Sequence, residues 1–145
     1  MIVVDASVFV KLLKEEEGSS LARSLVDRLL EQREDERYLA PSILLYEALS
    51  AALHVELPLE KVGSLLDGFR EFGLAIEDPS TAELALAEKI ARSEAPGGGH
   101  PALFDSIYHA MAIARGGTLV TSDERHFRKA EHYGNVVLLS KWRPE

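Results

Sequence analysis

The sequence predicts an α/β fold in which helices pack against a parallel β-sheet. Short runs of β-branched and other apolar residues recur along the chain, and helical stretches with apolar residues at i, i+3 and i+4 spacing lie between them. This alternation of strands and helices is typical of parallel sheets. The length of 145 residues, with 46% apolar residues, fits one domain with its own core.

The first part of the chain predicts one strand and two helices. Residues 2–4 form a β-branched run that stops at Asp5, which indicates a buried strand, and a short helix follows it. Ser19 or Ser20 is expected to cap a second helix, whose apolar positions continue at helical spacing to Leu30. The charged residues after this helix indicate a solvated loop.

The middle of the chain predicts two further strands and three helices. Residues 38–40 are a candidate strand, and Pro41 with Ser42 is expected to open a helix over residues 43–57, since proline is tolerated in the first turn. The remaining elements here are a helix over residues 59–72, a strand over residues 74–76 and a helix that begins at residues 79–81.

The last part of the chain predicts a loop followed by the final strands. Residues 95–101 are rich in glycine and proline and are expected to be mobile. A helix over residues 102–115 is expected to be closed by Gly116 and Gly117. The elements after it are a strand over residues 118–121, a helical turn that begins at Ser122 and Asp123, and a strand over residues 136–139.

Composition excludes several classes of protein. The chain contains no cysteine, which rules out a disulfide framework, a thiolate zinc site and a cysteine nucleophile. No apolar run approaches the roughly 18 residues of a membrane span, and the acidic start at Asp5 is unlike a signal peptide, so we expect a cytoplasmic protein without a membrane partner. Because the net charge is −8 and the negative charge is concentrated in residues 1–102, an anionic substrate would meet the C-terminal third most easily or would need a bound cation as intermediary.

Two acidic residues follow predicted strands. Asp5 ends the first strand, and Asp123 comes after the strand at residues 118–121. Ligands of parallel sheets bind outside the carboxyl ends of the strands, so both carboxylates are expected at the same edge of the sheet. Taken singly, either residue is also explained as an ordinary helix N-cap.

Two further acids lie in apolar helical stretches. Glu47 stands among leucines and alanines, and Asp105 stands between large apolar residues. A buried carboxylate needs a partner, and no lysine or arginine lies within four residues of Asp5, Glu47 or Asp105. A divalent cation is one partner that serves all of them, although Glu47 is also explained as a solvated residue and Asp105 as a helix cap.

An inventory of oxygen ligands without sulfur favours Mg²⁺ or Mn²⁺ over zinc. Ser7 and Thr121 lie one or two residues from the acids, so their hydroxyls are expected to orient a carboxylate or a metal-bound water. We expect His109 to be a surface residue rather than a ligand or base. The basic residues after Asp123 are expected to form a solvated face, and Trp142 to contribute to packing; the basic residues are Arg125, His126, Arg128 and Lys129.

These motifs resemble the PIN-domain ribonucleases, and among them the VapC-type toxins of toxin–antitoxin pairs. The segment 2–7 is similar to the family's first motif, a strand that ends in an aspartate with a hydroxyl residue two positions on. Glu47 matches the second acid, and Asp105 and Asp123 match the third and fourth with their usual separation. The resemblance covers essentially the whole chain, although the glycine-rich loop before Asp105 is not expected in the family.

The resemblance implies a fold, an activity and partners. It implies a single domain over residues 1–145 with a three-layer α/β sandwich, in which a five-stranded parallel sheet lies between helices. It implies endonucleolytic cleavage of RNA by a metal-activated water, a small antitoxin that blocks the acidic pocket, often with an arginine, and a homodimer. The site residues it implies, around Mg²⁺ or Mn²⁺, are Asp5, Glu47, Asp105 and Asp123.

Two other functions are compatible with parts of the sequence. A receiver-like phosphoacceptor domain also uses an acid after the first strand, a hydroxyl and a lysine, and Asp5, Thr121 and Lys141 are the matching residues. That interpretation leaves Glu47 and Asp105 without a role. A PIN-like fold used only for binding is the third hypothesis. For a homodimer, the apolar stripes of the helices over residues 43–57 and 59–72 are the expected interface.

Overall fold

The computed structural model describes residues 1–143 and contains a five-stranded sheet, all of whose strands are parallel. Every predicted strand is confirmed to within one residue at each end. The strands are β1 (Ile2–Val4), β2 (Tyr38–Pro41), β3 (Leu74–Glu77), β4 (Thr118–Thr121) and β5 (Val136–Leu138), in the spatial order β3-β2-β1-β4-β5.

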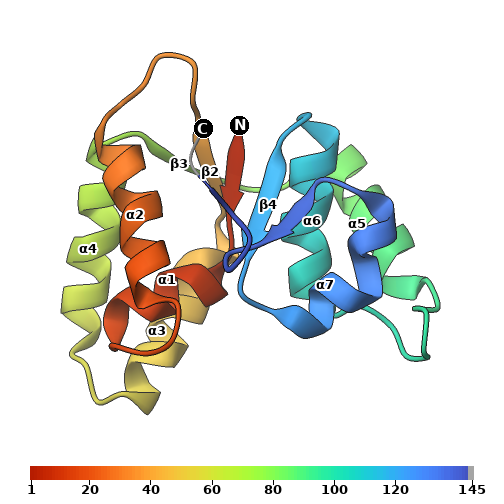
Figure 1. The fold of residues 1–145 in the computed structure, drawn as a ribbon, viewed down its shortest axis with the longest axis horizontal. Helices are drawn as coiled ribbons and strands as arrows, with labels where there is room; N and C mark the ends of the chain where they lie inside the picture. The colour runs from red at the N-terminus through yellow and green to blue at the C-terminus, as the bar shows by residue number, and fades with distance from the viewer. Residues whose placement is uncertain (144–145) are drawn as a thin grey trace.

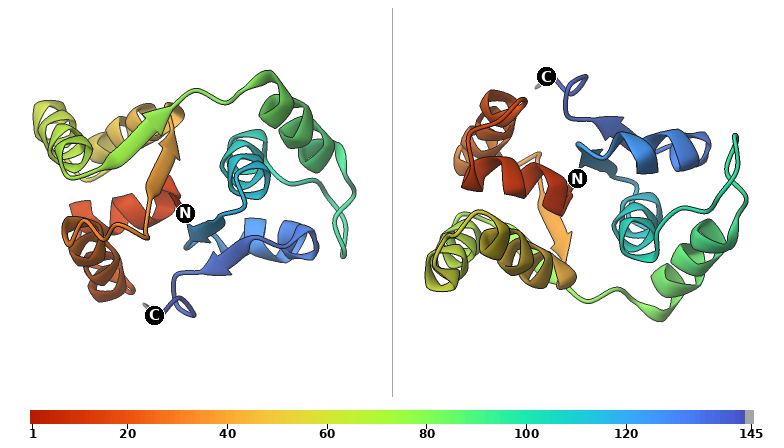
Figure 2. Two further views of the ribbon diagram at one scale, coloured as in Figure 1. Left: turned by 90° about the horizontal axis from the view of Figure 1, so that it is seen from above. Right: turned by 90° about the horizontal axis from the view of Figure 1, so that it is seen from below.

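Helices cover both faces of the sheet, as the α/β sandwich requires. Figure 1 shows α1 to α4 on one side of the sheet and α5 to α7 on the other, and the two views of Figure 2 show the same separation. The three-layer arrangement is therefore confirmed. The helices are α1 (Ala6–Leu13), α2 (Ser19–Leu30), α3 (Ile43–His54), α4 (Leu59–Glu71), α5 (Thr81–Arg92), α6 (Leu103–Ala114) and α7 (Glu124–Ala130), with a 3₁₀ turn at Glu131–Tyr133.

The central strands are mostly apolar because helices cover both faces of the sheet. Val3 of β1 lies beside Leu39 of β2 and Leu119 of β4, and all three side chains are almost completely buried. Apolar residues from helices on both sides cover them, among them Leu44 of α3 and Met111 of α6. These contacts fix the strand ends, and thereby the residues that follow them.

Strand β1 is the point at which the chain changes the direction in which it builds the sheet. The chain first adds β2 and β3 on one side of β1, and it then returns to place β4 and β5 on the other side. In parallel α/β sheets the crevice at such a switch point, outside the carboxyl ends of the strands, is the usual ligand site. Asp5 follows β1 and Asp123 follows β4, so both acids lie at this crevice.

The start of α2 differs from the prediction. Gly18, with a φ of 87°, occupies the N-cap position, and Ser19 is the first helical residue. The Ser19 hydroxyl instead accepts a hydrogen bond from the Glu16 amide at 2.9 Å and donates one to the Lys11 carbonyl at 2.8 Å. Ser19 therefore anchors the connection between α1 and α2 and does not cap the helix.

Pro41 was expected in a helix and lies in a strand. It is the last residue of β2, paired with Glu77 of β3, and the amide of Ser42 donates to the Glu77 carbonyl at 3.0 Å. The strand end tolerates proline, since little ladder pairing is lost there. Helix α3 therefore begins at Ile43 without a side-chain cap from Ser42.

Helix α3 also ends earlier than residue 57. Glu56 adopts a left-handed conformation with a φ of 57°, and the Leu57 amide bonds back to the Ala52 carbonyl at 2.9 Å. This is the hydrogen bond of a Schellman motif with glutamate in place of the usual glycine. The periodicity of apolar residues continues through this turn, which is why the sequence suggested a longer helix.

The predicted ends of α5 and α6 are confirmed. Ser80 and Glu83 form a reciprocal capping box at the start of α5. Gly116, with a φ of 63°, follows α6, and the Gly117 amide donates to the Ala112 carbonyl at 2.8 Å. Glycine suits this position because a side chain is strained at positive φ.

The loop at residues 95–101, predicted to be mobile, is tied down by hydrogen bonds. The Ala95 amide donates to the Gly99 carbonyl at 2.8 Å, and the His100 ring lies 2.7 Å from the Ser93 carbonyl. Lys129 donates to the His100 carbonyl at 3.0 Å. These contacts connect the loop to α7. In residues 1–143, no helix has the length and apolar character that crossing a membrane requires.

Candidate active site

Asp5 is a buried carboxylate held by two hydroxyls. It follows β1 directly and is only 4% exposed. Its Oδ2 accepts hydrogen bonds from the hydroxyls of Ser7 and Thr121, each at 2.6 Å. Asp5 occupies the N-cap position of α1, as the cap alternative expected, but its side chain makes no capping hydrogen bond to the helix and binds the two hydroxyls instead.

Ser7 and Thr121 also hold the segment after β4. The Ser7 hydroxyl accepts from the Ser122 amide at 2.8 Å, and the Thr121 hydroxyl accepts from the Asp123 amide at 3.0 Å. Each hydroxyl thus donates to Asp5 and accepts from the segment that leads into α7. The two residues were expected to orient a carboxylate, and their geometry agrees with that role.

Thr121→Val is expected to lower the free energy of unfolding by about 1–3 kcal/mol, because the Asp123 amide loses its acceptor and Asp5 Oδ2 loses one of its two hydroxyl donors and keeps only Ser7. Urea denaturation measures the change. The matched control is Thr118→Val on the same strand, since the Thr118 side chain makes no hydrogen bond within residues 1–143. Equal effects of the two substitutions would contradict this account of Thr121.

Asp123 caps α7 and remains available for a ligand. Its Oδ1 accepts from the amides of Arg125 at 2.9 Å and His126 at 3.0 Å. The interpretation of Asp123 as a helix N-cap is therefore confirmed. Because only one oxygen serves the cap, this role does not exclude a second one for Oδ2.

Glu47 is positioned by a tyrosine that the sequence analysis did not single out. The hydroxyl of Tyr108, a fully buried residue of α6, donates to Glu47 Oε1 at 3.0 Å. Glu47 is only partly buried on α3, and burial is the main cause that raises the pKa of its carboxyl, with the nearby Asp5 charge adding to it. The signal available in the sequence was a tyrosine three residues after Asp105, at helical spacing.

Of the four acids, Asp105 has the fewest hydrogen-bond contacts between its side chain and the rest of the protein. It is the third residue of α6, whose N-cap is Ala102, so it does not cap the helix. Within residues 1–143 its side chain accepts no hydrogen bond, although it is partly buried. Burial first, and then the charges of the other three acids, raise the pKa of Asp105 to about 7.

The electrostatics place all four acids in one interacting group. The carboxylates of Asp5, Asp123 and Glu47 each act on Asp105, and Asp123 also acts on Asp5. Burial is the largest cause that raises the pKa of Asp5, and the hydroxyls of Ser7 and Thr121 oppose it. A region that disfavours its own negative charges favours binding a cation.

The donors fit Mg²⁺ or Mn²⁺ in chemistry, since all of them are carboxylate oxygens. Three of the acids already have one oxygen held by the protein: Asp5 by hydroxyls, Glu47 by Tyr108 and Asp123 by backbone amides. Within the described residues, however, no three Asp, Glu or His side chains are near enough to one another to hold a metal ion together. Mg²⁺ usually keeps several waters and takes one or two carboxylates, so a partly water-mediated site suits this spacing.

His109 was expected at the surface and is fully buried. One ring nitrogen, Nε2, lies 2.6 Å from the Gly134 carbonyl, and Nδ1 lies 3.1 Å from Nε2 of the buried His126. Burial lowers the pKa of both rings, that of His126 to about 4, so both are neutral at pH 7. A carbonyl only accepts, so His109 carries its proton on Nε2, and His126 donates to His109 from its own Nε2.

This histidine pair joins α6 to α7. His109 lies one turn after Asp105, and His126 lies one turn after Asp123, whose carboxylate its amide binds. In the sequence, the indication that His109 lies near the acids was its position four residues after Asp105, on the same face of the helix. The basic residues after Asp123 were expected to form one solvated face. The prediction is wrong for His126, which is buried, whereas Arg125 and Arg128 are exposed.

Comparisons with known proteins agree with this fold. A family model described as PIN domain matches residues 2–132, while a comparison with curated proteins gives no match. A solved structure of Mycobacterium tuberculosis VapC20, described as a sarcin–ricin loop cleaving toxin, is similar at 15% identity and a TM-score of 0.69, over 99% of this chain and 100% of that one.

Two further solved structures have similar folds. For VapBC2 from Rickettsia felis bound to a promoter DNA fragment, the identity is 20% and the TM-score 0.68, over 95% of this chain and 97% of that chain. For FitAcB from Neisseria gonorrhoeae, the identity is 23% and the TM-score 0.62, over 98% of this chain and 100% of that chain. At these identities the similarity establishes the fold.

Proposed function

The chain belongs to the PIN domain family, whose model matches residues 2–132, and on this premise we propose that it is a metal-dependent endoribonuclease, the toxin of a type II toxin–antitoxin pair. The observation that carries the proposal is the interacting group of Asp5, Glu47, Asp105 and Asp123 at the switch point of the sheet. Within residues 1–143, no lysine or arginine forms a salt bridge with any of these four acids, which come from four separate segments, and a bound divalent cation would balance their charge.

We assign the metal to these carboxylates, with Asp5, Asp105 and Asp123 as the main ligands, not all of them direct, since no three acids among the described residues lie near enough to hold one ion together, and with Glu47 binding directly or through water. When bound, Mg²⁺ or Mn²⁺ would lower the pKa of a water so that its deprotonated form could attack phosphorus, and it would neutralise charge on the phosphate. Ser7 and Thr121 fix the orientation of Asp5, and Tyr108 fixes that of Glu47. Asp105 holds a proton near neutral pH without the ion, and it must release that proton when a cation binds.

The negative net charge of the chain supports the proposal that a bound cation mediates contact with the substrate. A protein with a net charge of −8 repels a polyanion, so phosphate contacts alone would not hold RNA. A divalent ion at the acidic group reverses the local sign at the position where the scissile phosphate must lie. Recognition of RNA mostly targets exposed single strands, which suits an open edge of a sheet.

We also propose a small antitoxin as the partner, with an arginine that pairs with the acids. The similar VapBC2 structure from Rickettsia felis, described as bound to promoter DNA, supports this proposal. Co-expression with the product of an adjacent small reading frame is expected to suppress cleavage, and replacing its arginine with alanine is expected to restore it. Because both substrate and partner are intracellular in such a system, we propose the cytoplasm as the location.

A homodimer through α3 and α4 is part of the proposal. Large apolar side chains remain exposed on these helices and at their ends, which is typical of an interaction surface. They are Tyr46 at 68%, Leu53 at 66%, Leu59 at 42% and Phe72 at 46% exposure. Sedimentation velocity of the wild type and of Leu53→Glu tests this interface, and an unchanged dimer in the variant would contradict it.

The activity is tested with purified protein and a single-stranded RNA labelled at one end. We expect internal cleavage with Mn²⁺ or Mg²⁺ and none with excess EDTA. Metal binding without cleavage would instead favour a PIN-like binding module. A receiver-like function would leave Glu47 and Asp105 unused, and the lysine it would need, Lys141, lies 5.6 Å from the centre of the Phe127 ring.

Tyr108→Phe is expected to reduce the cleavage rate about 10–100-fold, because Glu47 loses the hydroxyl that orients it. Single-turnover cleavage of the same RNA measures the loss. The control is Tyr133→Phe, which removes a hydroxyl that makes no hydrogen bond within residues 1–143. A rate in Tyr108→Phe equal to that of the control would remove Tyr108 from the site.

A further inference from the structure

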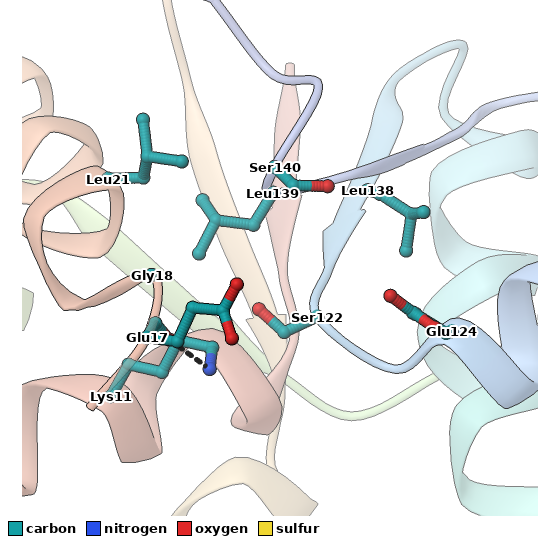
Figure 3. A pocket seen from close by; sticks show the side chains of 9 residues that line it. All are labelled: Lys11, Glu17, Gly18, Leu21, Ser122, Glu124, Leu138, Leu139 and Ser140. Atoms are coloured by element: carbon teal, nitrogen blue, oxygen red, sulfur yellow. Dashed lines mark hydrogen bonds between the residues drawn. The ribbon is translucent and has the colours of Figure 1, made fainter.

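A hollow lies beside the acidic group, on the side of α1, α2 and β5. Its volume is about 250 Å³, below the roughly 300–1,000 Å³ of pockets for drug-sized ligands, so it suits one small planar group. Figure 3 shows it between the start of α2 and the segment that follows β5. The lining residues are Lys11, Glu17, Gly18, Leu21, Ser122, Glu124, Leu138, Leu139 and Ser140.

This hollow, the β5-side pocket, shares its wall with the acidic group. Ser122 lies between Thr121 and Asp123 in the chain, and its amide donates to the Ser7 hydroxyl that holds Asp5. Lys11 lies one helical turn after Ser7 on α1. A nucleotide adjacent to a phosphate at the acids is therefore within reach of the pocket.

The pocket contains more hydrogen-bond acceptors than free donors. Its lysine is already engaged, because Lys11 Nζ donates to the Glu17 carbonyl at 2.7 Å and lies 3.4 Å from the Glu16 carboxylate. The carboxylates of Glu17 and Glu124 lie on opposite sides of the space in Figure 3. Two carboxylates disfavour a phosphate as the occupant, and they favour a neutral group that carries N–H donors.

One polar atom of the pocket has no partner. The Ser122 hydroxyl is buried and makes no hydrogen bond within residues 1–143, whereas nearly all buried polar atoms in proteins have one. Figure 3 shows it between Glu17 and Glu124, below Leu139. Leu21, Leu138 and Leu139 give the same space an apolar surface, against which a flat ring can pack.

We propose that the β5-side pocket binds the base of a nucleotide next to the scissile phosphate and selects bases that carry an exocyclic amino group. The carboxylates accept from that amino group, as glutamate accepts from cytosine. Adenine, cytosine and guanine meet the requirement and uracil does not. The proposal rests on the proposed function, to which it adds a determinant of cleavage-site preference.

The variants follow from these contacts. Leu21→Trp fills the pocket, and Glu124→Gln replaces a pure acceptor with a mixed donor and acceptor. Matched controls are Leu84→Trp and Glu88→Gln, which line a different depression on α5. None of these four residues belongs to the group that we assign to metal binding.

The first test is cleavage of a random-sequence single-stranded RNA with Mn²⁺, followed by sequencing of the ends. At one position beside the cut we expect uracil to be disfavoured by about fivefold to a hundredfold, the range of one good base contact. Both pocket variants are expected to lose this preference while still cleaving, and both controls to keep it. No base preference in the wild type, or an unchanged preference in both pocket variants, would overturn the proposal.

The second test needs no activity. Adenosine, cytidine or uridine is titrated into the metal-free protein, and backbone amide shifts are followed by NMR at Gly18, Ser122 and Leu139. Adenosine and cytidine are expected to shift these amides more than uridine does, and Leu21→Trp to abolish the effect. Shifts without any RNA cleavage would refute the ribonuclease and retain the pocket. Cleavage with neither base preference nor shifts would refute the pocket alone.

Discussion

Asp5→Asn is expected to abolish RNA cleavage and at the same time to make the metal-free protein more stable at neutral pH. The cleavage rate is expected to fall by at least about a hundredfold, because a central ligand of the proposed metal site is lost. Stability is expected to rise because the Asp5 carboxylate is almost fully buried, and burial raises its pKa and disfavours its charged form. Asparagine retains an oxygen that can accept from Ser7 and Thr121.

Urea denaturation in EDTA measures the stability, and single-turnover cleavage in Mn²⁺ measures the activity. The control is Asp27→Asn, an exposed residue of α2, for which we expect neither effect. An Asp5→Asn protein that is less stable than the wild type without metal would show that the carboxylate has a structural role. Retained cleavage would remove Asp5 from the mechanism.

Asp105→Asn is expected to change how stability depends on pH. The pKa of Asp105 is about 7 in the folded chain and near 3.8 without its surroundings, so the folded state keeps a proton that the unfolded state has released. The metal-free wild type therefore loses stability as pH rises from about 4 to 7. Asp105→Asn has no such proton to release, so at pH 7.5 its free energy of unfolding is expected to exceed that of the wild type by about 2 kcal/mol. This value allows for solvent screening of the partly exposed side chain.

The difference in unfolding free energy between Asp105→Asn and the wild type is the decisive quantity. It is expected to be near zero at pH 4 and to grow until about pH 7, as measured by urea denaturation in EDTA at several pH values. Asp27→Asn should give a difference that does not grow over this range. A constant difference for Asp105→Asn would show that the other acids do not act on Asp105. Cleavage by this variant should fall at least as far as in Asp5→Asn.

The sequence predicted the sheet and the placement of the acids because both follow from local patterns. β-branched runs mark buried strands, and an acid at a strand end lies at the carboxyl edge whatever the details of packing. Asp5 and Asp123 were placed in this way, and the switch point between β1 and β4 confirmed their common edge. Ser80 and Gly116 were predictable for a similar reason, because a capping box and a left-handed glycine depend on a few adjacent residues.

Contacts between distant segments were beyond the reach of these patterns. Tyr108 binds Glu47 across 61 positions, and His109 meets His126 only because α6 and α7 pack together. A histidine in the sequence is typical of the surface, and the burial of His109 depends on the Gly134 carbonyl, which accepts a hydrogen bond from its ring N–H. Pro41 was misplaced because a strand end tolerates proline as well as a helix start does.

Calorimetric titration of Mn²⁺ and Mg²⁺ into the metal-free protein tests the central claim most directly, since the four acids are proposed to share one divalent-cation site. We expect saturable binding near pH 8, weaker binding below pH 7 as Asp105 retains its proton, and loss of binding in both Asp5→Asn and Asp105→Asn. Asp27→Asn should bind as the wild type does. No binding of either ion to the wild type, or binding unchanged in both acid variants, would contradict the metal-dependent account.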